Sequence, residues 1–176
     1  MKTLEHIAPE KIKDYLAKGW LTHDGMWFYN TCRTAGIEQA NMLNRAAIRS
    51  MAPMEIQRTM KILGITRKDI ITFDDLTDFM LKALALLMPG SIIGQFTTTM
   101  PEPNVMRWEW REGECFAYKG VKLIGCIDRY ACGVIYRIAC WLDVLGFEYR
   151  IEPGIDSCMM HEKGYCRGDI IVDFPG

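Results

Sequence analysis

The sequence has almost no net charge and no apolar segment long enough for a membrane helix. Lys and Arg together number 21 and Asp and Glu number 22, which gives a net charge of -1 at pH 7 with neutral histidine. This balance provides no electrostatic basis for binding nucleic acid or an anionic membrane surface. The most apolar stretch, residues 79–94, contains Lys82 and is interrupted by Pro89 and Gly90, whereas a membrane span needs roughly 20 uninterrupted apolar residues. We therefore expect neither nucleic acid nor a membrane as a partner.

Several catalytic and targeting signatures are also absent from the sequence. It has neither of the common Gly-rich phosphate-binding motifs, and it lacks the G-x-S-x-G motif of a nucleophilic serine. Only three histidines occur, so a histidine-based reaction would have to use His23 or His161. The first residues are charged and lack the apolar segment of a secretory signal. We therefore expect a cytoplasmic protein, in which a cysteine cluster indicates metal or redox chemistry before it indicates a disulfide framework.

The apolar pattern predicts a single domain over residues 1–176 with a helical half at 1–90. Hydrophobic residues make up 49% of the chain, enough for a sizeable core. They recur at helical spacing in the first half, where glycines and prolines divide them into successive helices. The helices are expected at 9–19, 22–36, 37–52, 53–64 and 76–88.

After Gly90 the spacing changes to that of strands. Met106, Trp108 and Trp110 alternate with charged residues, which predicts a strand with one aromatic face. The second half is expected to form an antiparallel sheet of about four strands, with one long helix between two hairpins and the helical half packed on the sheet. This is an α+β fold. The strands are expected at 91–100, 105–111, 147–152 and 169–174, and the helix at 125–145.

Seven cysteines are present, and six of them lie in the segment 115–166. Cys158 and Cys166 flank a short polar loop, so their sulfur atoms can face one ion. Zn²⁺ takes four tetrahedral ligands and binds thiolates well, and Cys132 and Cys115 are candidates for the other two positions. A redox disulfide between Cys158 and Cys166 is the main alternative. The cysteines that core packing explains at least as well are Cys32, Cys126 and Cys140.

The segment from Cys132 to Phe174 resembles the vinyl-reductase-type ligand-binding domain, which also serves as the sensory module of phenol-responsive transcription activators. In that domain a cysteine near a helix start and two cysteines flanking a glycine-containing loop hold a structural zinc. The resemblance implies that Cys132, Cys158 and Cys166 hold zinc here. The family's acidic fourth ligand is replaced by Ile155. Its substitutes, in order of preference, are Cys115, Asp156, His161 and Glu152.

Four further segments are shared with a second family. They are HDGMWF at 23–28, CFAY at 115–118, YACG at 130–133 and WLDVLG at 141–146. With these segments the whole chain resembles an uncharacterised cytosolic family related to aminothiazoline-carboxylate hydrolases. The resemblance implies a homodimer and leaves the activity open.

Residues able to line a pocket for a small ligand come from both halves. They are His23, Trp27, Trp108, Trp110, Arg129 and Tyr130. Core packing is the commoner explanation of the tryptophan stripe, and a partly exposed position in the first turn of a helix is the commoner explanation of His23. A solvated position explains Arg129 equally well. The favoured function is a binding domain for a small aromatic or hydrocarbon-like ligand, with a structural zinc held by cysteines. The alternative is a hydrolase of a small heterocyclic or amide substrate, which would use a metal-bound water or a nucleophilic cysteine.

Overall fold

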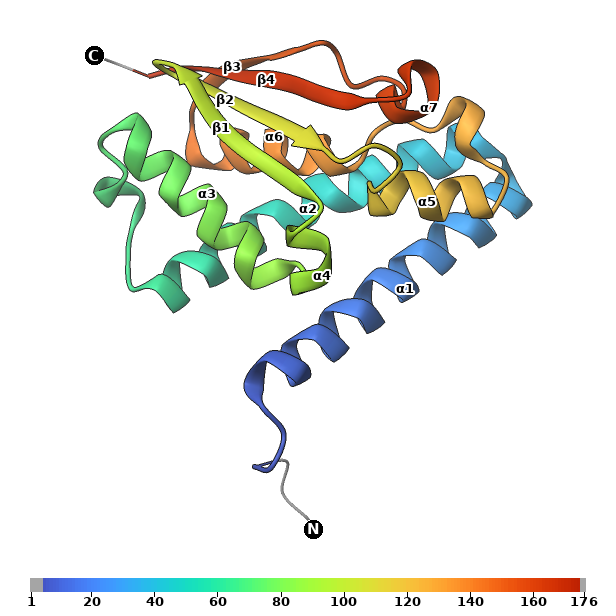
Figure 1. Ribbon diagram of the computed structural model, residues 1–176, viewed down its shortest axis with the longest axis horizontal. Helices are drawn as coiled ribbons and strands as arrows, with labels where there is room; N and C mark the ends of the chain where they lie inside the picture. Colours follow the sequence, from blue (N-terminus) through green and yellow to red (C-terminus); the bar gives the residue numbers. More distant parts are fainter. Residues whose placement is uncertain (1–4, 175–176) are drawn as a thin grey trace.

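The fold is a four-stranded antiparallel sheet with helices packed against one of its faces (Figure 1). The computed structural model describes residues 5–174. The α-helices are α1 Pro9–Ala35, α2 Ile37–Leu63, α3 Phe73–Leu87, α4 Gly90–Ile93, α5 Phe116–Leu123, α6 Val134–Leu145 and α7 Met159–Lys163. The strands are β1 Phe96–Glu102, β2 Val105–Trp110, β3 Glu148–Glu152 and β4 Cys166–Asp173, and the 3-10 helices are η1 Arg67–Asp69 and η2 Ile127–Arg129. The predicted α+β class is confirmed.

The sheet has the strand order β1-β2-β4-β3, and each neighbouring pair is antiparallel. In β2 the side chains of Met106, Trp108 and Trp110 are buried, whereas Arg107 on the opposite face is exposed. On that outer face Arg107 Nε donates to Asp169 Oδ1 of β4 at 2.7 Å. The aromatic face of β2 therefore packs on the helices and the charged face meets solvent, as the alternation predicts.

Two long helices replace the four shorter ones expected from the glycine and proline positions. Helix α1 continues through Gly19, and α2 continues through Pro53. In α2 the buried residues Ile48, Ala52 and Ile56 lie one turn apart on the side that contacts α6. This stripe anchors α2 on both sides of Pro53, although a proline inside a helix removes one backbone hydrogen bond. The predicted helix ends at these two residues are wrong because tertiary packing outweighs the local signal.

The second half contains short helices that the apolar pattern did not predict, namely α4, α5 and α7. Because α4 occupies the start of the first expected strand, β1 begins only at Phe96. Helix α6 likewise begins late, at Val134. The reason is a contact with α2: the Asn41 side chain donates to the Arg129 carbonyl at 2.7 Å and accepts from the Ala131 amide at 3.1 Å. These bonds hold the residues before α6 in a non-helical path.

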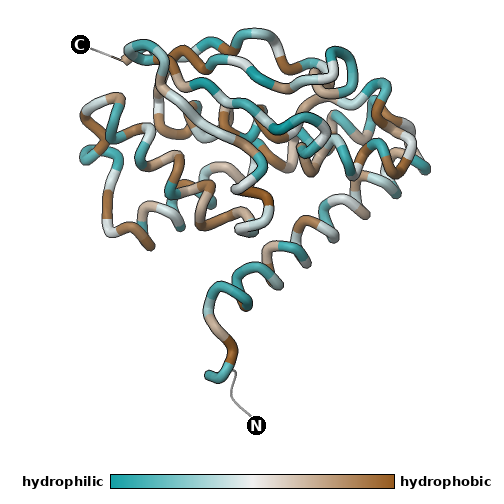
Figure 2. Tube along the Cα trace, viewed as in Figure 1, coloured by the Kyte–Doolittle hydropathy of each residue, from teal (hydrophilic) through white to brown (hydrophobic). Residues whose placement is uncertain are grey.

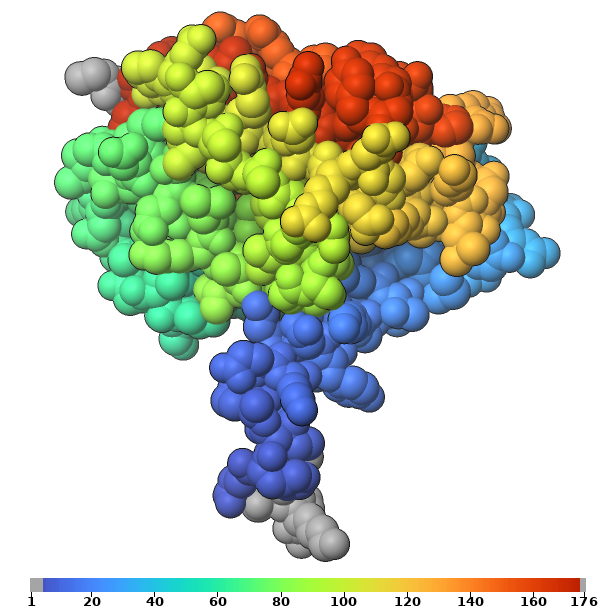
Figure 3. Space-filling model, in the orientation of Figure 1, coloured from blue at the N-terminus to red at the C-terminus, as the bar shows by residue number. Residues whose placement is uncertain are grey.

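The first half of α1 projects from the rest of the molecule (Figures 1 and 3). Its residues Tyr15 and Leu16 are 78% and 63% exposed. Figure 2 shows hydrophilic and hydrophobic residues interspersed along this part of the helix. None of the helices formed by residues 5–174 has both the length and the apolar character needed to cross a membrane.

Gly168 marks a place where β4 leaves no room for a side chain. It pairs with Trp108 of β2, and a Cβ atom there would clash with the Trp108 ring and lie 2.6 Å from the Glu152 carbonyl oxygen. We expect Gly168→Ala to lower the free energy of unfolding by about 1–3 kcal/mol, because neither neighbour can move freely. Denaturation in guanidinium chloride measures this change.

The matched control is Gly19→Ala in α1, where a Cβ atom would meet nothing within 4 Å. Alanine stabilises an exposed helix position by up to about 1 kcal/mol relative to glycine, so this variant should be slightly more stable. Equal unfolding midpoints for Gly168→Ala and the parent chain would contradict the close pairing of β2 with β4.

Candidate functional site

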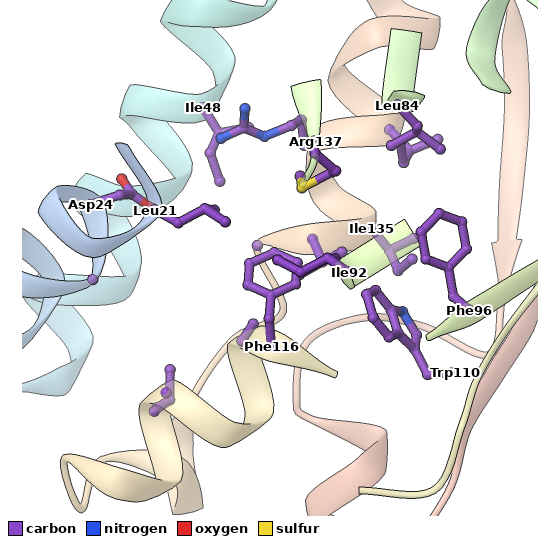
Figure 4. Close-up of a pocket in the computed structure, with 18 of the residues that line it drawn as sticks. Leu21, Asp24, Ile48, Leu84, Ile92, Phe96, Trp110, Phe116, Ile135 and Arg137 are labelled. Carbon is purple, nitrogen blue, oxygen red and sulfur yellow. The ribbon is translucent and has the colours of Figure 1, made fainter. Parts of the chain in front are cut away.

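A cavity of about 260 Å³ lies between the inner face of the sheet and the helices. Helices α1, α2, α3, α5 and α6 and strands β1 and β2 all contribute to its wall, as Figure 4 shows in part. Most of the lining side chains are apolar or aromatic. They include Leu21, Phe28, Ile48, Met80, Leu84, Ile92, Phe96, Met106, Trp108, Trp110, Phe116, Val121, Ile135 and Ile138.

One side of the cavity is formed by three aromatic rings in mutual contact (Figure 4). The ring centroids of Phe96 and Trp110 are 5.0 Å apart, and those of Trp110 and Phe116 are 5.9 Å apart. The second pair meets edge to face. Such a cluster presents both ring faces and ring edges, which suits contact with another planar apolar group.

The opposite side of the cavity is polar and contains Asp24 of α1 and Arg137 of α6 (Figure 4). The Arg137 side chain is only 8% exposed, and its Nη1 lies 2.6 Å from Glu55 Oε1. Its guanidinium also lies over the Trp20 ring, 4.8 Å from the centroid. Trp141 Nε1 donates to the second oxygen of Glu55 at 2.8 Å. Because a buried charge must be paired and hydrogen-bonded, Glu55 is the residue that keeps Arg137 at the cavity wall.

Asp24 lines the cavity on its polar side. Desolvation by the surrounding protein raises the pKa of its carboxyl above the usual 3.8, and the positive charges of Arg137 and His23 oppose this rise. The residue still has exposed surface. Asp24 is therefore protonated over a wider pH range than a fully exposed aspartate, and it can present either a donor or an acceptor to a ligand.

Three of the six residues predicted to bind a ligand line this cavity, namely Trp108, Trp110 and Tyr130. The Tyr130 hydroxyl accepts a hydrogen bond from the Gly133 amide at 3.1 Å. Gly133 allows a close approach to α2, because a Cβ atom there would lie only 2.9 Å from Asn44 Nδ2. The contact that requires glycine is thus with a side chain of α2.

The other three predicted residues lie outside the cavity. His23 and Trp27 share a face of α1, but it is not the face that carries Asp24, and Trp27 is 66% exposed. Arg129 lies at the surface in an ion pair with Glu38 of α2. The helical spacing correctly groups His23 with Trp27, but it does not indicate which face of α1 turns toward the sheet.

Three residues of the polar side were not predicted as site residues, namely Asp24, Arg137 and its partner Glu55. The sequence does contain one signal for Arg137. It is the single charged residue between Val134 and Leu142, inside an otherwise largely apolar helical stretch. A lone charge on a helix that is expected to be buried requires a partner, although the sequence does not show that this partner is Glu55.

The four cysteines predicted as zinc ligands gather where the N-terminal ends of α5, α6 and α7 meet the start of β4. Cys115 and Cys158 are the N-cap residues of α5 and α7, Cys132 precedes α6, and Cys166 begins β4. Burial raises the pKa of Cys115 to about 12 and of Cys166 to about 11. The negative charge of a thiolate at Cys132 contributes to both rises, which indicates that these side chains share one neighbourhood.

Several N–H groups face these sulfur atoms. Burial raises the pKa of the thiols at the three helix ends, and backbone amides of the first helical turns oppose that rise. The buried Trp108 Nε1 forms no hydrogen bond of ordinary geometry, yet it lies close enough to Cys166 to favour its thiolate form. N–H donors directed at sulfur are a common outer shell of metal-bound thiolates. The donor set therefore suits a thiophilic metal.

The side chains themselves are not arranged around a metal position. Among residues 5–174, no three His, Cys, Asp or Glu side chains are grouped closely enough to hold an ion. Three of the four substitutes for the fourth ligand have other partners. Asp156 is 3.5 Å from Arg45, His161 Nε2 is 3.1 Å from Asp128, and Glu152 is 3.0 Å from Arg150. Cys115 is thus the substitute that lies with the other thiols, and the zinc stays a prediction.

Helix α2 holds the two loops that carry Cys132 and Cys158. Asn41 bonds the backbone just before Cys132, as described above. Arg45, one turn later, donates to the Ile155 carbonyl at 2.9 Å, just before Cys158. Its charge also favours the thiolate of Cys132. One face of α2 therefore fixes both segments relative to each other, whether or not a metal is bound.

Comparisons with known proteins give a match only for the helical half of the chain. No curated protein and no solved structure matches the sequence. The resemblances to the hydrolase-related family and to the vinyl-reductase-type domain therefore rest on the residues quoted for them. Residues 5–87, which include α1, α2 and α3, match DUF6125, a family of unknown function.

Proposed function

We propose that this chain binds a small, mostly apolar molecule of one or two aromatic rings in the cavity between the sheet and α1, α5 and α6. The observation that carries the proposal is the cavity itself, about 260 Å³ of space with a largely apolar wall. Protein interiors are otherwise close-packed, with few voids larger than a water molecule. An apolar cavity of about 150 Å³ is enough to take up benzene. Space of this size in the core of a small chain favours a binding role.

The two sides of the cavity favour a particular orientation of the ligand. Its ring would contact Phe96, Trp110 and Phe116, whose own rings already touch one another. A single polar group, such as a hydroxyl, would face Asp24 and Arg137 on the opposite side. A few well-placed polar groups in a mainly apolar wall are typical of sites that bind and orient small molecules.

The composition of the wall favours binding over hydrolysis. The described residues that line the cavity include no cysteine and no histidine, and their one carboxylate is that of Asp24, which has exposed surface. A cysteine-dependent hydrolase needs its nucleophile and a base within hydrogen-bond reach of the substrate. A metal-dependent one needs an open coordination position beside it. The thiol cluster therefore suits a role in stability better than a role in a reaction within this cavity.

We further propose that Cys115, Cys132, Cys158 and Cys166 hold a structural zinc. Zinc supplies folding energy when four protein ligands close its coordination sphere, and four thiolates leave no position for water. The ion would join the starts of α5, α6 and α7 to β4. Support comes from the shared neighbourhood of the four thiols and from the N–H groups that face them. The homodimer implied by the family resemblance stays a prediction.

The cavity proposal is tested by filling the cavity from α1. Gly25 lines it, and a Cβ atom there would meet nothing within 4 Å. We expect Gly25→Leu to weaken the binding of p-cresol at least about tenfold, equivalent to about 1.4 kcal/mol. The leucine side chain would occupy space that the ring needs. Isothermal titration calorimetry with p-cresol and toluene measures the affinities.

Gly19→Leu is the matched control, because Gly19 lies in the same helix, has open space around its Cβ position and does not line the cavity. Both variants should gain helix stability by about 0.8 kcal/mol, so a difference in binding between them reflects the cavity alone. Equal affinities in the two variants, or no saturable binding of either probe to the parent chain, would refute the proposed function.

A further inference from the structure

Cys32 and Cys126 form a close thiol pair that belongs neither to the cavity wall nor to the proposed zinc site. Cys32 lies in the last turn of α1, and Cys126 directly precedes η2. Their Sγ atoms are 2.7 Å apart, although the two residues are 94 positions apart in the sequence. Even carbon atoms, which are smaller than sulfur, are in contact at about 3.5–4.0 Å. The pair is therefore closer than side-chain packing alone requires.

The backbone on both sides of the pair is fixed by hydrogen bonds. Gly125 adopts φ 72°, which glycine permits, and this turn lets the Cys126 amide donate to the Val121 carbonyl at 3.1 Å. On the other side, the Cys32 carbonyl accepts from the Gly36 amide at 3.1 Å. Both residues are half-buried. A bond between the sulfurs therefore requires little movement, and a small reagent can reach them.

We propose that Cys32 and Cys126 are a redox modification site at which a small disulfide, such as oxidised glutathione, converts the two thiols into a protein disulfide. The thiolate of one cysteine attacks a sulfur of the small disulfide, whose S–S bond breaks and releases one small thiol after protonation. The second cysteine then attacks the mixed disulfide and releases the other small thiol. Two protein thiols are oxidised and one small disulfide is reduced to two thiols.

The bond would join two parts of the wall around the cavity, but the inference does not rest on the proposed function. It would tie α1 to the connection between α5 and η2, next to the edge-to-face contact of Phe28 with Tyr130. A cross-link over so long a stretch of chain restricts the unfolded state, so the oxidised protein should resist denaturant better. Burial, together with the neighbouring Cys126, raises the pKa of Cys32 to about 11, so the exchange should be slow at neutral pH.

The test equilibrates the full chain in buffers with graded ratios of reduced to oxidised glutathione. Free thiols are then trapped with iodoacetamide, and intact mass and peptide mapping locate the bonds. At an early stage of oxidation, we expect the chain to lose the mass of two hydrogen atoms. Peptide mapping should then find a peptide linked through Cys32 and Cys126. We also expect a higher guanidinium chloride midpoint for the oxidised form. In Cys126→Ser, Cys32 should gain one glutathione and the midpoint should not rise.

Cys140→Ser is the control, because Cys140 is buried in α6 and should leave the linked peptide unchanged. If a variant fails to fold, the disulfide found in the parent chain alone tests the proposal. Alkylated Cys32 and Cys126 in buffers that oxidise other thiols of the chain would overturn the proposal. So would a first disulfide between Cys158 and Cys166.

Discussion

Replacing Glu55 by alanine should lower the free energy of unfolding by about 3–5 kcal/mol, among the largest single-residue effects expected for this chain. Arg137 is 8% exposed and Glu55 is 11% exposed, and their charges are 2.6 Å apart. Without Glu55 the guanidinium stays buried with no counter-charge, and Trp141 Nε1 loses its acceptor. Denaturation in guanidinium chloride, followed by tryptophan fluorescence, measures the effect.

The contrast with a surface pair isolates burial as the cause. Arg129 and Glu38 also form an ion pair, but their side chains are 70% and 74% exposed. Glu38→Ala should therefore cost no more than about 1 kcal/mol, because water solvates and screens such a pair. If Glu55→Ala and Glu38→Ala have the same effect, the buried network does not carry the stability assigned to it.

A double substitution separates the cost of leaving a buried charge unpaired from the cost of lost packing. Replacing Glu55 and Arg137 together by leucine and methionine removes both charges and keeps most of the side-chain volume. Such replacements of buried ion pairs are often neutral or stabilising, so the double variant should be more stable than Glu55→Ala. The same variant keeps Asp24 but lacks Arg137 on the polar side of the cavity, and its affinity for p-cresol should fall relative to toluene. An equal loss for both probes would contradict the role given to Arg137 in orienting the ligand.

Periodicity alone was sufficient to predict the parts of the fold whose residues have one clear inner face. The alternation of Met106, Trp108 and Trp110 with charged residues defined both the strand β2 and its buried side. The failures occurred where a contact distant in sequence overrides a local signal. Pro53 indicates a helix end, yet the packing of α2 on α6 continues through it. The bonds that Asn41 makes before α6 cannot be seen in a helical pattern.

In the candidate site, too, the sequence predicted what depends on a local pattern and missed what depends on tertiary contacts. Cysteine spacing singled out Cys158 and Cys166, because two thiols that flank a short loop form a local pattern. The close pair of Cys32 with Cys126 depends on how α1 lies against the segment after α5. A local pattern does not show this contact, and Cys32 is expected to be a core residue because its helix offers no polar neighbours. The choice between the two faces of α1 is likewise a tertiary matter, and it decides that Asp24 rather than Trp27 lies at the cavity.

Cys158→Ser should remove most of the zinc from the chain and destabilise it strongly. Protein purified without chelator is expected to contain about one zinc per chain, held by four thiolates. Serine in place of one ligand leaves three, and metal binding that is coupled to folding then contributes much less. We expect a loss of about 4 kcal/mol or more, which corresponds to roughly 8–16 °C in Tm for a chain of this size. Metal analysis and calorimetry measure the two effects.

The control and a chelator show whether the metal causes the loss. Cys140→Ser should keep its zinc, because Cys140 lies within α6 and away from the thiol cluster. Adding a strong chelator should lower the Tm of the parent chain to that of Cys158→Ser and leave the variant unchanged, since the variant has little metal to lose. A parent chain that is metal-free and unaffected by the chelator would leave the four cysteines with a packing role only. The cavity and its polar side would still stand, because neither contains a cysteine.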